Sequence, residues 1–442
     1  MKKFFHSVTL DKEKCKGCTN CIKRCPTEAI RVQNGKAKIL SDRCIDCGEC
    51  IRVCPHHAKQ ATYDKLDVLE RFSYKIALPA PSLYSQFNHL DNIDTVLNGL
   101  LSMGFDEVFE VSRAAELVSD ATRRLLSSGA LTKPVISSAC PTITRLIRVR
   151  FPDLLDHLLP LLTPAELAAR LAKKEAAEKT GFPPEQIGTV FISPCPAKVT
   201  SVKMTLGTRK SDIDAVIAIK DVYPRLLSYM KDLEGMEELS NSGRIGIGWG
   251  SSGGEASAMF NERYLAADGI ENCIRVLEDL EDDKFGDLDF VELDACPGGC
   301  VGGVLTVENP YIAKVKLKQL RRFLPVSCNR FPDQIPDFAK WDAPVEYEPV
   351  MELDSDLGTA MEKMAEIDRI TARLPGLDCG SCGSPSCRSL AEDIVRGYTT
   401  EDACIFILKE SMLNIAESLA RLGRQDLNLP DNNEEGNEES KT

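Results

Sequence analysis

Long apolar runs, a secretory signal and an excess of positive charge are all missing from this sequence of 442 residues. No stretch of about 18 apolar residues occurs, and the opening MKKFFHSVTL is too short and too polar for a signal peptide, so we expect a cytoplasmic protein without a membrane partner. The net charge is −13 at pH 7, which argues against nucleic acid as a partner. No segment is typical of a kinase, PAS or DNA-binding domain, so any signal would have to pass to another protein.

Cysteine, in contrast, is abundant, with 18 residues. All but Cys273 and Cys328 fall in ordered motifs, and we expect those two to be ordinary buried or surface thiols. So many thiols outside any disulfide pattern are typical of a reducing compartment. The chain length and the 43% hydrophobic content suffice for two or three compact domains.

Two consecutive CxxCxxCxxxCP runs open the chain. Their cysteines are Cys15, Cys18, Cys21 and Cys25, then Cys44, Cys47, Cys50 and Cys54. This pattern resembles a bacterial dicluster ferredoxin, in which the fourth cysteine of each run ligates the other cluster. The resemblance implies that Cys54 completes the first [4Fe-4S] cube and Cys25 the second. A zinc ribbon built from the CxxC pairs is the alternative, and the regular CP endings disfavour it.

A third motif with the spacing CX2CX4CX16C lies near the C-terminus. Its cysteines are Cys379, Cys382, Cys387 and Cys404. It is similar to the single [4Fe-4S] module of corrinoid iron–sulfur proteins and of some membrane electron-transfer subunits.

Three further segments carry the remaining cysteines. They are SSACP with Cys140, SPCPAK with Cys195, and DACPGGCVGG with Cys296 and Cys300. A lone cysteine before proline is usually a small buried residue, but the three segments in this order resemble the signatures of the [FeFe]-hydrogenases. In that family the four thiolates hold a [4Fe-4S] cube, and the last one, here Cys300, bridges to a di-iron subsite with CO, cyanide and a dithiolate, where H2 is split or made. With the third motif behind it, the chain resembles the branch of the family suspected of sensing H2.

The glycines around Cys300 leave room for backbone to approach a bulky cofactor. They are Gly298, Gly299, Gly302 and Gly303. Strand-like runs at 134–137, 189–192 and 289–293 precede the ligands, which therefore lie at the carboxyl ends of strands, and we expect a cofactor clamped between two α/β lobes. Segment 246–254 is expected to be a strand with a glycine turn that lines the cofactor pocket; alone it would be a weak dinucleotide or phosphate signal.

The sequence also departs from the family. Ala139 replaces the cysteine that passes protons to the subsite, and segment 119–124 lacks the expected glutamate pair. Ser193 and Asp294 stand where methionines normally contact the cofactor, and Asp294 is a candidate substitute relay. Lys198 is retained, and the resemblance implies that it hydrogen-bonds a cyanide ligand; a surface salt bridge is the alternative.

We therefore expect a multi-domain α/β protein. Its parts are a dicluster ferredoxin domain of α+β type (1–62), a two-lobed α/β hydrogenase-like domain with the H-cluster (70–345), a helical linker (346–372), a [4Fe-4S] module (373–405), an amphipathic helix (406–424) and a disordered acidic tail (425–442). The apolar stripe of the helix either packs on the module or docks a signalling partner.

The expected function is a low-turnover reaction of H2 with protons and electrons in an anaerobe, serving as an H2 or redox sensor. Electrons would pass through three accessory [4Fe-4S] clusters to a ferredoxin-like or other redox partner. Two alternatives stay open. One is a catalytic ferredoxin-linked hydrogenase with a different proton path, and the other is a non-hydrogenase iron–sulfur electron-transfer protein, against which the retained Cys300 and Lys198 argue.

Overall fold

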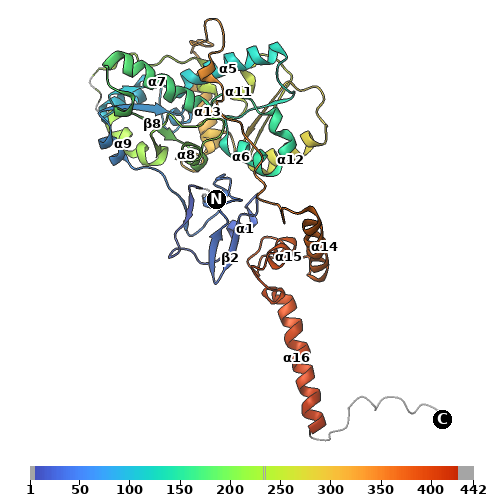
Figure 1. Ribbon diagram of the computed structural model, residues 1–442. Coiled ribbons are helices and arrows are strands. Elements are labelled where there is room, and N and C mark those ends of the chain that lie inside the picture. The colour runs from blue at the N-terminus through green and yellow to red at the C-terminus, as the bar shows by residue number, and fades with distance from the viewer. Residues whose placement is uncertain (1–4, 232, 234, 427–442) are drawn as a thin grey trace, which may run out of the picture.

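In the computed structural model, which describes residues 5–231, 233 and 235–426, the chain forms an N-terminal α+β unit, a large α/β core and a helical C-terminal module (Figure 1). The N-terminal unit holds two antiparallel strand pairs, β1 (Val8–Leu10) with β4 (Lys59–Ala61) and β2 (Ile30–Gln33) with β3 (Lys36–Ile39). The short helices α1 (Asn20–Lys23) and α2 (Glu49–Arg52) carry cysteines of the two repeats. Within the described ranges, no helix is both long and apolar enough to cross a membrane.

The larger sheet of the core has four parallel strands in the order β6-β5-β8-β9. They are β5 (Tyr74–Pro79), β6 (Glu107–Val108), β8 (Ile187–Ser193) and β9 (Ala215–Ala218). Because parallel strands are covered on both faces, they are mostly apolar, and every residue of β8 is buried. Helices α5 (Val111–Ser128) and α7 (Pro164–Thr180) pack on one face, and α4 (Ile93–Ser102) and α9 (Ile219–Lys231) on the other.

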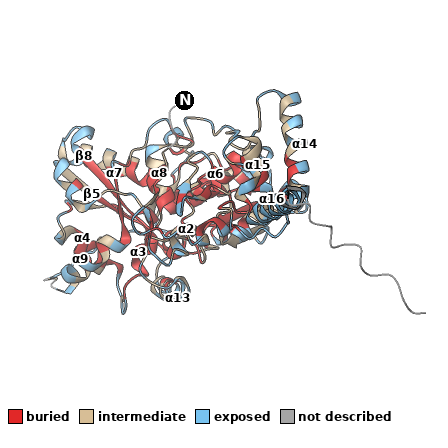
Figure 2. Cartoon of the chain, turned by 90° about the horizontal axis from the view of Figure 1, so that it is seen from below, coloured by how far each residue is buried: buried red, intermediate tan, exposed pale blue. Residues whose placement is uncertain are grey.

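The second sheet has three parallel strands in the order β10-β11-β7. They are β7 (Val135–Ile136), β10 (Tyr264–Asp268) and β11 (Phe290–Asp294). Val291 and Leu293 pack with apolar residues of α6 (Pro141–Arg150) and α12 (Ile270–Glu281). Figure 2 shows buried residues, in red, across the interior of the core, including α6, β5 and β8. Cys273 is fully buried in this cluster and Cys328 is exposed, so both are placed as ordinary thiols.

The three strand-like runs before the cysteine segments are strands β7, β8 and β11. The expected strand at 246–254 is wrong, because the segment holds the short helices α10 (Arg244–Gly248) and α11 (Gly254–Ser257). The physical reason is close packing of α10 on α5. A Cβ at Gly246 would lie 2.2 Å from the Ser112 carbonyl oxygen, so this glycine serves helix contact and not a strand.

The C-terminal module contains α14 (Leu357–Arg373), α15 (Cys387–Val395) and α16 (Ile405–Asp426). The linker helix begins at Leu357 and not near residue 346, because the Asp356 side chain caps it by accepting from the Thr359 backbone N–H at 2.8 Å. The predicted helix at 406–424 lies within α16, which projects away from the rest of the molecule (Figure 1). Residues 427–442 of the predicted tail lie outside the described residues.

Candidate metal centres

Four cysteines of the core meet where the two sheets end. Cys140 follows β7, Cys195 follows β8, and Cys296 follows β11, while Cys300 begins a short 3-10 turn, Cys300–Gly302. Burial raises the pKa of the Cys296 thiol, and the nearby sulfurs of the other three cysteines raise it further. Four soft thiols held together in a buried site fit an iron–sulfur cube, whose binding would displace their protons.

The glycines of the last segment fit the loop to the chain's own backbone. Gly299 has a φ of +88°, and a Cβ there would lie 2.3 Å from the Ser252 backbone nitrogen. A Cβ would lie 1.9 Å from the Pro297 carbonyl oxygen at Gly302 and 2.2 Å from the Pro194 carbonyl oxygen at Gly303, whereas at Gly298 the nearest atom would be 3.5 Å away. These contacts let the cysteine loop turn tightly, and the expected close approach of the glycines to a cofactor stays a prediction.

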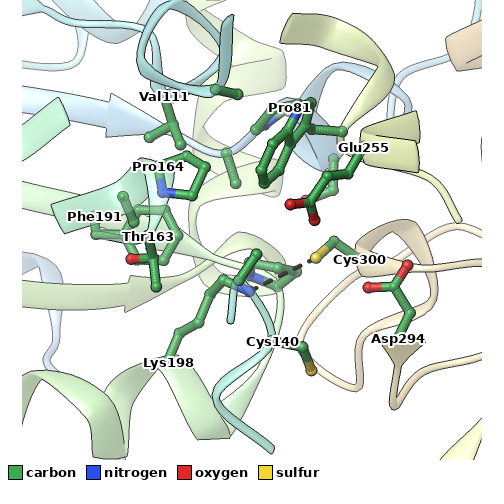
Figure 3. A pocket seen from close by; sticks show the side chains of 18 of the residues that line it. Pro81, Val111, Cys140, Thr163, Pro164, Phe191, Lys198, Glu255, Asp294 and Cys300 are labelled. Atoms are coloured by element: carbon green, nitrogen blue, oxygen red, sulfur yellow. Dashed lines mark hydrogen bonds between the residues drawn. The ribbon is translucent and has the colours of Figure 1, made fainter. Parts of the chain in front are cut away.

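A buried pocket lies beside Cys300, lined from both lobes (Figure 3). Ala139, Cys140, Lys198, Asp294 and Cys300 all line it, so residues of three separate segments of the sequence come together. Side chains such as Phe191 and Trp249 make much of the remaining wall apolar. Charges in such a dry site interact more strongly than in water.

Lys198, on α8 (Pro196–Lys203), donates a hydrogen bond to the Cys300 sulfur at 3.7 Å. Burial alone would lower the pKa of its ammonium, but the neighbouring cysteine sulfurs, that of Cys300 first, raise the pKa above its usual range. Lys198 is therefore a half-buried cation that lines the pocket, and it forms no ion pair with a carboxylate among the described residues. A fixed positive charge fits an anionic cofactor at this place.

Three carboxyl groups face the same pocket, and the sequence reasoning found only Asp294. Burial raises the pKa of Asp294 to about 6 and the pKa of Glu255 to about 8. The Ser137 hydroxyl donates to Glu255 Oε2 at 2.6 Å, and Glu255 Oε1 has no hydrogen-bond partner among the described residues. Glu292 accepts from the backbone N–H groups of Gly253 and Ala256. Two signals in the sequence could have revealed the other two carboxyl groups: Glu292 stands inside the apolar run VELDA, and Glu255 directly follows the glycine-rich segment.

The other positions singled out by sequence have local roles. Ser193 Oγ donates to the Cys195 carbonyl oxygen at 3.0 Å, so it shapes the turn that presents Cys195. In segment 119–124, Asp120 forms an ion pair with Arg124, and Ser119 accepts from the Trp249 indole N–H at 2.9 Å. The ion pair lies within α5, and the Trp249 contact joins α5 to the segment that follows α10.

The N-terminal cysteines form two sets, each around its own small cavity. One set is Cys15, Cys18, Cys21 and Cys54, and the other is Cys25, Cys44, Cys47 and Cys50. This is the crossed grouping that the ferredoxin resemblance implies. Lys59 also lines the first cavity, and its buried ammonium nitrogen has no hydrogen-bond partner within the described part of the chain. An unpaired buried cation beside four thiols fits an anionic iron–sulfur cluster.

The third cysteine set surrounds a cavity of its own in the C-terminal module. It consists of Cys379, Cys382, Cys387 and Cys404. The module contacts the N-terminal unit at the first set, since the Val32 backbone N–H, beside that cavity, donates to the Gly383 carbonyl oxygen at 2.8 Å.

The second N-terminal set lies against the core. Gly48 is close to the Val304 side chain, and Arg52 donates to the Gly302 carbonyl oxygen at 2.8 Å. The C-terminal module therefore contacts the N-terminal unit, and the N-terminal unit contacts the core.

Comparisons with known proteins agree with this geometry. The family model described as "Iron only hydrogenase large subunit, C-terminal domain" matches residues 73–266 and 255–304. A 4Fe-4S dicluster domain model matches residues 7–55, and an Fe-S cluster model matches residues 374–406. These matches, together with the cysteine sets, identify an iron–sulfur protein.

Two curated relatives and one solved structure illustrate the similarity. The periplasmic [Fe] hydrogenase large subunit of Nitratidesulfovibrio vulgaris is 27% identical over 368 aligned positions, covering 67% of this chain and 86% of the relative. Iron hydrogenase 1 of Clostridium pasteurianum is 25% identical over 393 positions, covering 71% and 68%. A solved [FeFe]-hydrogenase from Chlamydomonas reinhardtii is 17% identical, with a TM-score of 0.47, covering 57% of this chain and 86% of its own.

Proposed function

The chain belongs to the [FeFe]-hydrogenase family, and on that premise we propose that it reacts H2 reversibly with protons and electrons at an H-cluster. The observation that carries the proposal is the Lys198 ammonium next to Cys300, in a largely apolar pocket beside four converging thiols. Cys140, Cys195, Cys296 and Cys300 would hold the cube, and Cys300 would also hold a di-iron subsite in the pocket. When bound, that subsite would supply the metal centre for splitting or forming H2.

The chain's own residues would orient the cofactor and manage protons. Lys198 would place a positive charge against the anionic ligands of the subsite and fix its orientation. The apolar walls would keep bulk water away from the reacting atoms. Lys198, whose ammonium donates to the Cys300 sulfur, and the thiolates would act together as a positioning set.

Low turnover is the second part of the proposal. The methyl group of Ala139 lines the pocket and cannot carry a proton, which removes one step that efficient members of the family use. Glu255 and Asp294 are the substitute proton carriers that the pocket offers, because each has a pKa raised toward neutrality by burial. A slower or less direct proton route would suit H2 detection better than bulk H2 production.

Electron transfer along the four cysteine sets supports a sensing role. We propose one [4Fe-4S] cluster in each N-terminal set and one in the C-terminal module, which together link the core to the far end of the molecule. A redox partner or a signalling partner would then meet the protein at the C-terminal module, and the proposed location is the cytoplasm.

A catalytic hydrogenase with an unusual proton path is the second candidate, and the unpartnered Glu255 oxygen in the pocket favours it. The two candidates separate in one experiment on anaerobically matured protein. Infrared spectra under H2 and under inert gas, combined with an H2 turnover assay, report the CO and cyanide ligands and the rate. We expect bands that respond to H2 together with slow turnover. Turnover of hundreds per second would favour the catalytic candidate, and the absence of bands would refute both.

A further inference from the structure

Helix α16 exposes an apolar stripe that nothing in the described chain covers. The 22-residue helix starts directly after Cys404 and is about 33 Å long at 1.5 Å per residue. Ile407, in its first turn, packs against the module, but the helix beyond that point extends into solvent (Figures 1 and 2). Most of the stability of a helix comes from packing of its apolar face, so α16 lacks its main stabilising contact in a single chain.

The spacing of the stripe is that of a coiled coil. Apolar residues recur at alternating intervals of three and four, at Ile405, Leu408, Met412, Ile415, Leu419 and Leu422. These six residues fill the a and d positions of consecutive heptads, with Ile405 at a and Leu408 at d, and together they form the seam of the helix. Their exposed fractions run from 37% at Leu408 to 63% at Leu419. A strict 3.5-residue period points to a narrow seam facing another helix and not to a broad face lying on a globular surface.

The residues beside the seam suit its burial. Ser411, Ala416 and Ser418 occupy g and e positions and are small and uncharged, so a second helix can approach closely there, whereas Lys409, at the first e position, places a charge at the edge of the seam. The charged residues Glu410, Glu417 and Arg421 lie at f and c positions, on the side away from the seam. The helix therefore has a dry side and a solvated side at coiled-coil spacing.

We propose that α16 pairs with α16 of a second copy of this chain in a parallel two-stranded coiled coil. In such a pair each a residue faces the same a residue, and each d residue the same d residue, so this sequence alone supplies both halves of the seam. Ile405 also lines the cavity of the third cysteine set, but the other five seam residues belong to no apolar cluster of the described chain, which leaves them free for the second copy.

The pairing would also bring two metal centres together. Cys404 directly precedes the first a position, Ile405, and lines the cavity of the third cysteine set. In a parallel pair the helix axes lie about 8–10 Å apart, so both Cys404 residues would flank the dimer axis. Two C-terminal clusters would then be close enough for electrons to pass between the two chains. This consequence rests on the proposed cluster in the module, whereas the pairing itself does not.

The test uses the full-length, cluster-loaded protein under anaerobic conditions, with light scattering or sedimentation over a wide concentration range. We expect the mass of two chains for the wild type. Ile415→Glu, in the middle of the seam, should give a twofold loss of mass. Leu413→Glu is the matched control, because Leu413 is 55% exposed on the same turn but lies at a b position, and it should keep the mass of two chains. Iron content per chain should be equal in all three proteins.

The possible results separate clearly. A wild type with the mass of one chain or of three chains overturns the proposal, and so does dissociation by Leu413→Glu to the same degree as by Ile415→Glu. Electron paramagnetic resonance of the reduced protein tests the parallel arrangement, since spin coupling between the two C-terminal clusters should appear in the wild type and disappear in Ile415→Glu. A stable dimer without such coupling overturns the parallel arrangement.

Discussion

Arg31 of the N-terminal unit and Asp393 of the C-terminal module form a buried ion pair, although they lie 362 positions apart in the chain. Their side chains are only 4% and 8% exposed, and the guanidinium meets both carboxylate oxygens. The Ser384 hydroxyl donates to the same carboxylate at 2.9 Å. This two-point contact fixes the third cysteine set next to the first, which is the link on which the proposed electron route depends.

Breaking that pair should loosen the module. Asp393→Asn leaves the Arg31 guanidinium buried without its countercharge, and loss of one partner of a buried pair costs about 3–5 kcal/mol. We expect faster backbone hydrogen exchange across α15 and slower reduction of the C-terminal cluster through the N-terminal clusters. Arg388→Met is the control, because its pair with Asp368 is more than half exposed on both sides and should contribute about 0–1 kcal/mol. Equal exchange rates in both variants would contradict the proposed docking role.

Replacing Lys198 should affect the core site alone. Lys198→Met keeps the volume of the side chain but removes the charge next to Cys300, and groups that orient a metal site typically contribute about 10–100-fold in affinity. We expect a matching loss of subsite occupancy, measured from infrared band intensity per iron, while the other three clusters stay. Lys203→Met changes an exposed lysine at the end of the same helix and should leave the bands unchanged. Full band intensity in Lys198→Met would rule out the positioning role.

Restoring a proton carrier should raise the rate. Ala139→Cys places an ionisable thiol at the pocket wall, and a well-placed proton-transfer group contributes about 10²–10⁴-fold. We expect H2 turnover to rise by about 10²-fold with unchanged infrared bands. Ala139→Ser is the comparison, since a hydroxyl fills similar space without a suitable pKa, and it should gain little. An unchanged rate in Ala139→Cys would show that proton transfer at this position does not limit turnover.

The pH dependence should report Glu255. Since burial raises its pKa to about 8, the carboxyl keeps its proton at about pH 6 and has lost it at about pH 9. If Glu255 delivers protons, H2 formation by the wild type falls as the pH rises through about 8, because the proton-bearing form disappears. Glu255→Gln should lower the rate at about pH 6 and flatten that part of the profile. H/D exchange in Asp294→Ala gives the complementary result, because its complete loss there would assign the relay to Asp294 instead.

Three strands of the core, β7, β8 and β11, could be predicted from the sequence because each contains an apolar run that is typical of a buried parallel strand. The run at 189–192 is an example. The helices at 244–257 were missed because glycines that permit close helix packing look the same in sequence as glycines of a turn. Glu255 escaped notice because a single glutamate carries no period, and its burial depends on packing between elements far apart in the chain.

The candidate site also has parts that the sequence predicts and parts that only the fold shows. Motif spacing and family resemblance suggested the four cysteine sets, since cluster ligation imposes regular intervals that survive in the sequence. Contacts between parts of the molecule, such as Arg31 with Asp393, have no such interval and only the fold shows them. The ligand roles, the low turnover and the sensing role stay predictions until the cofactors are measured.

The bond between the Val32 backbone N–H and the Gly383 carbonyl oxygen also bears on how the protein is made. Strand β2 leaves the ribosome long before residue 383, so during synthesis this edge of the hairpin presents an unpaired donor. An open strand edge can pair wrongly with another chain, and that exposure ends only when the C-terminal module has been translated and docked. Truncation before residue 383 should therefore favour aggregation of the nascent N-terminal unit. The C-terminal module would thus protect the N-terminal unit from aggregation.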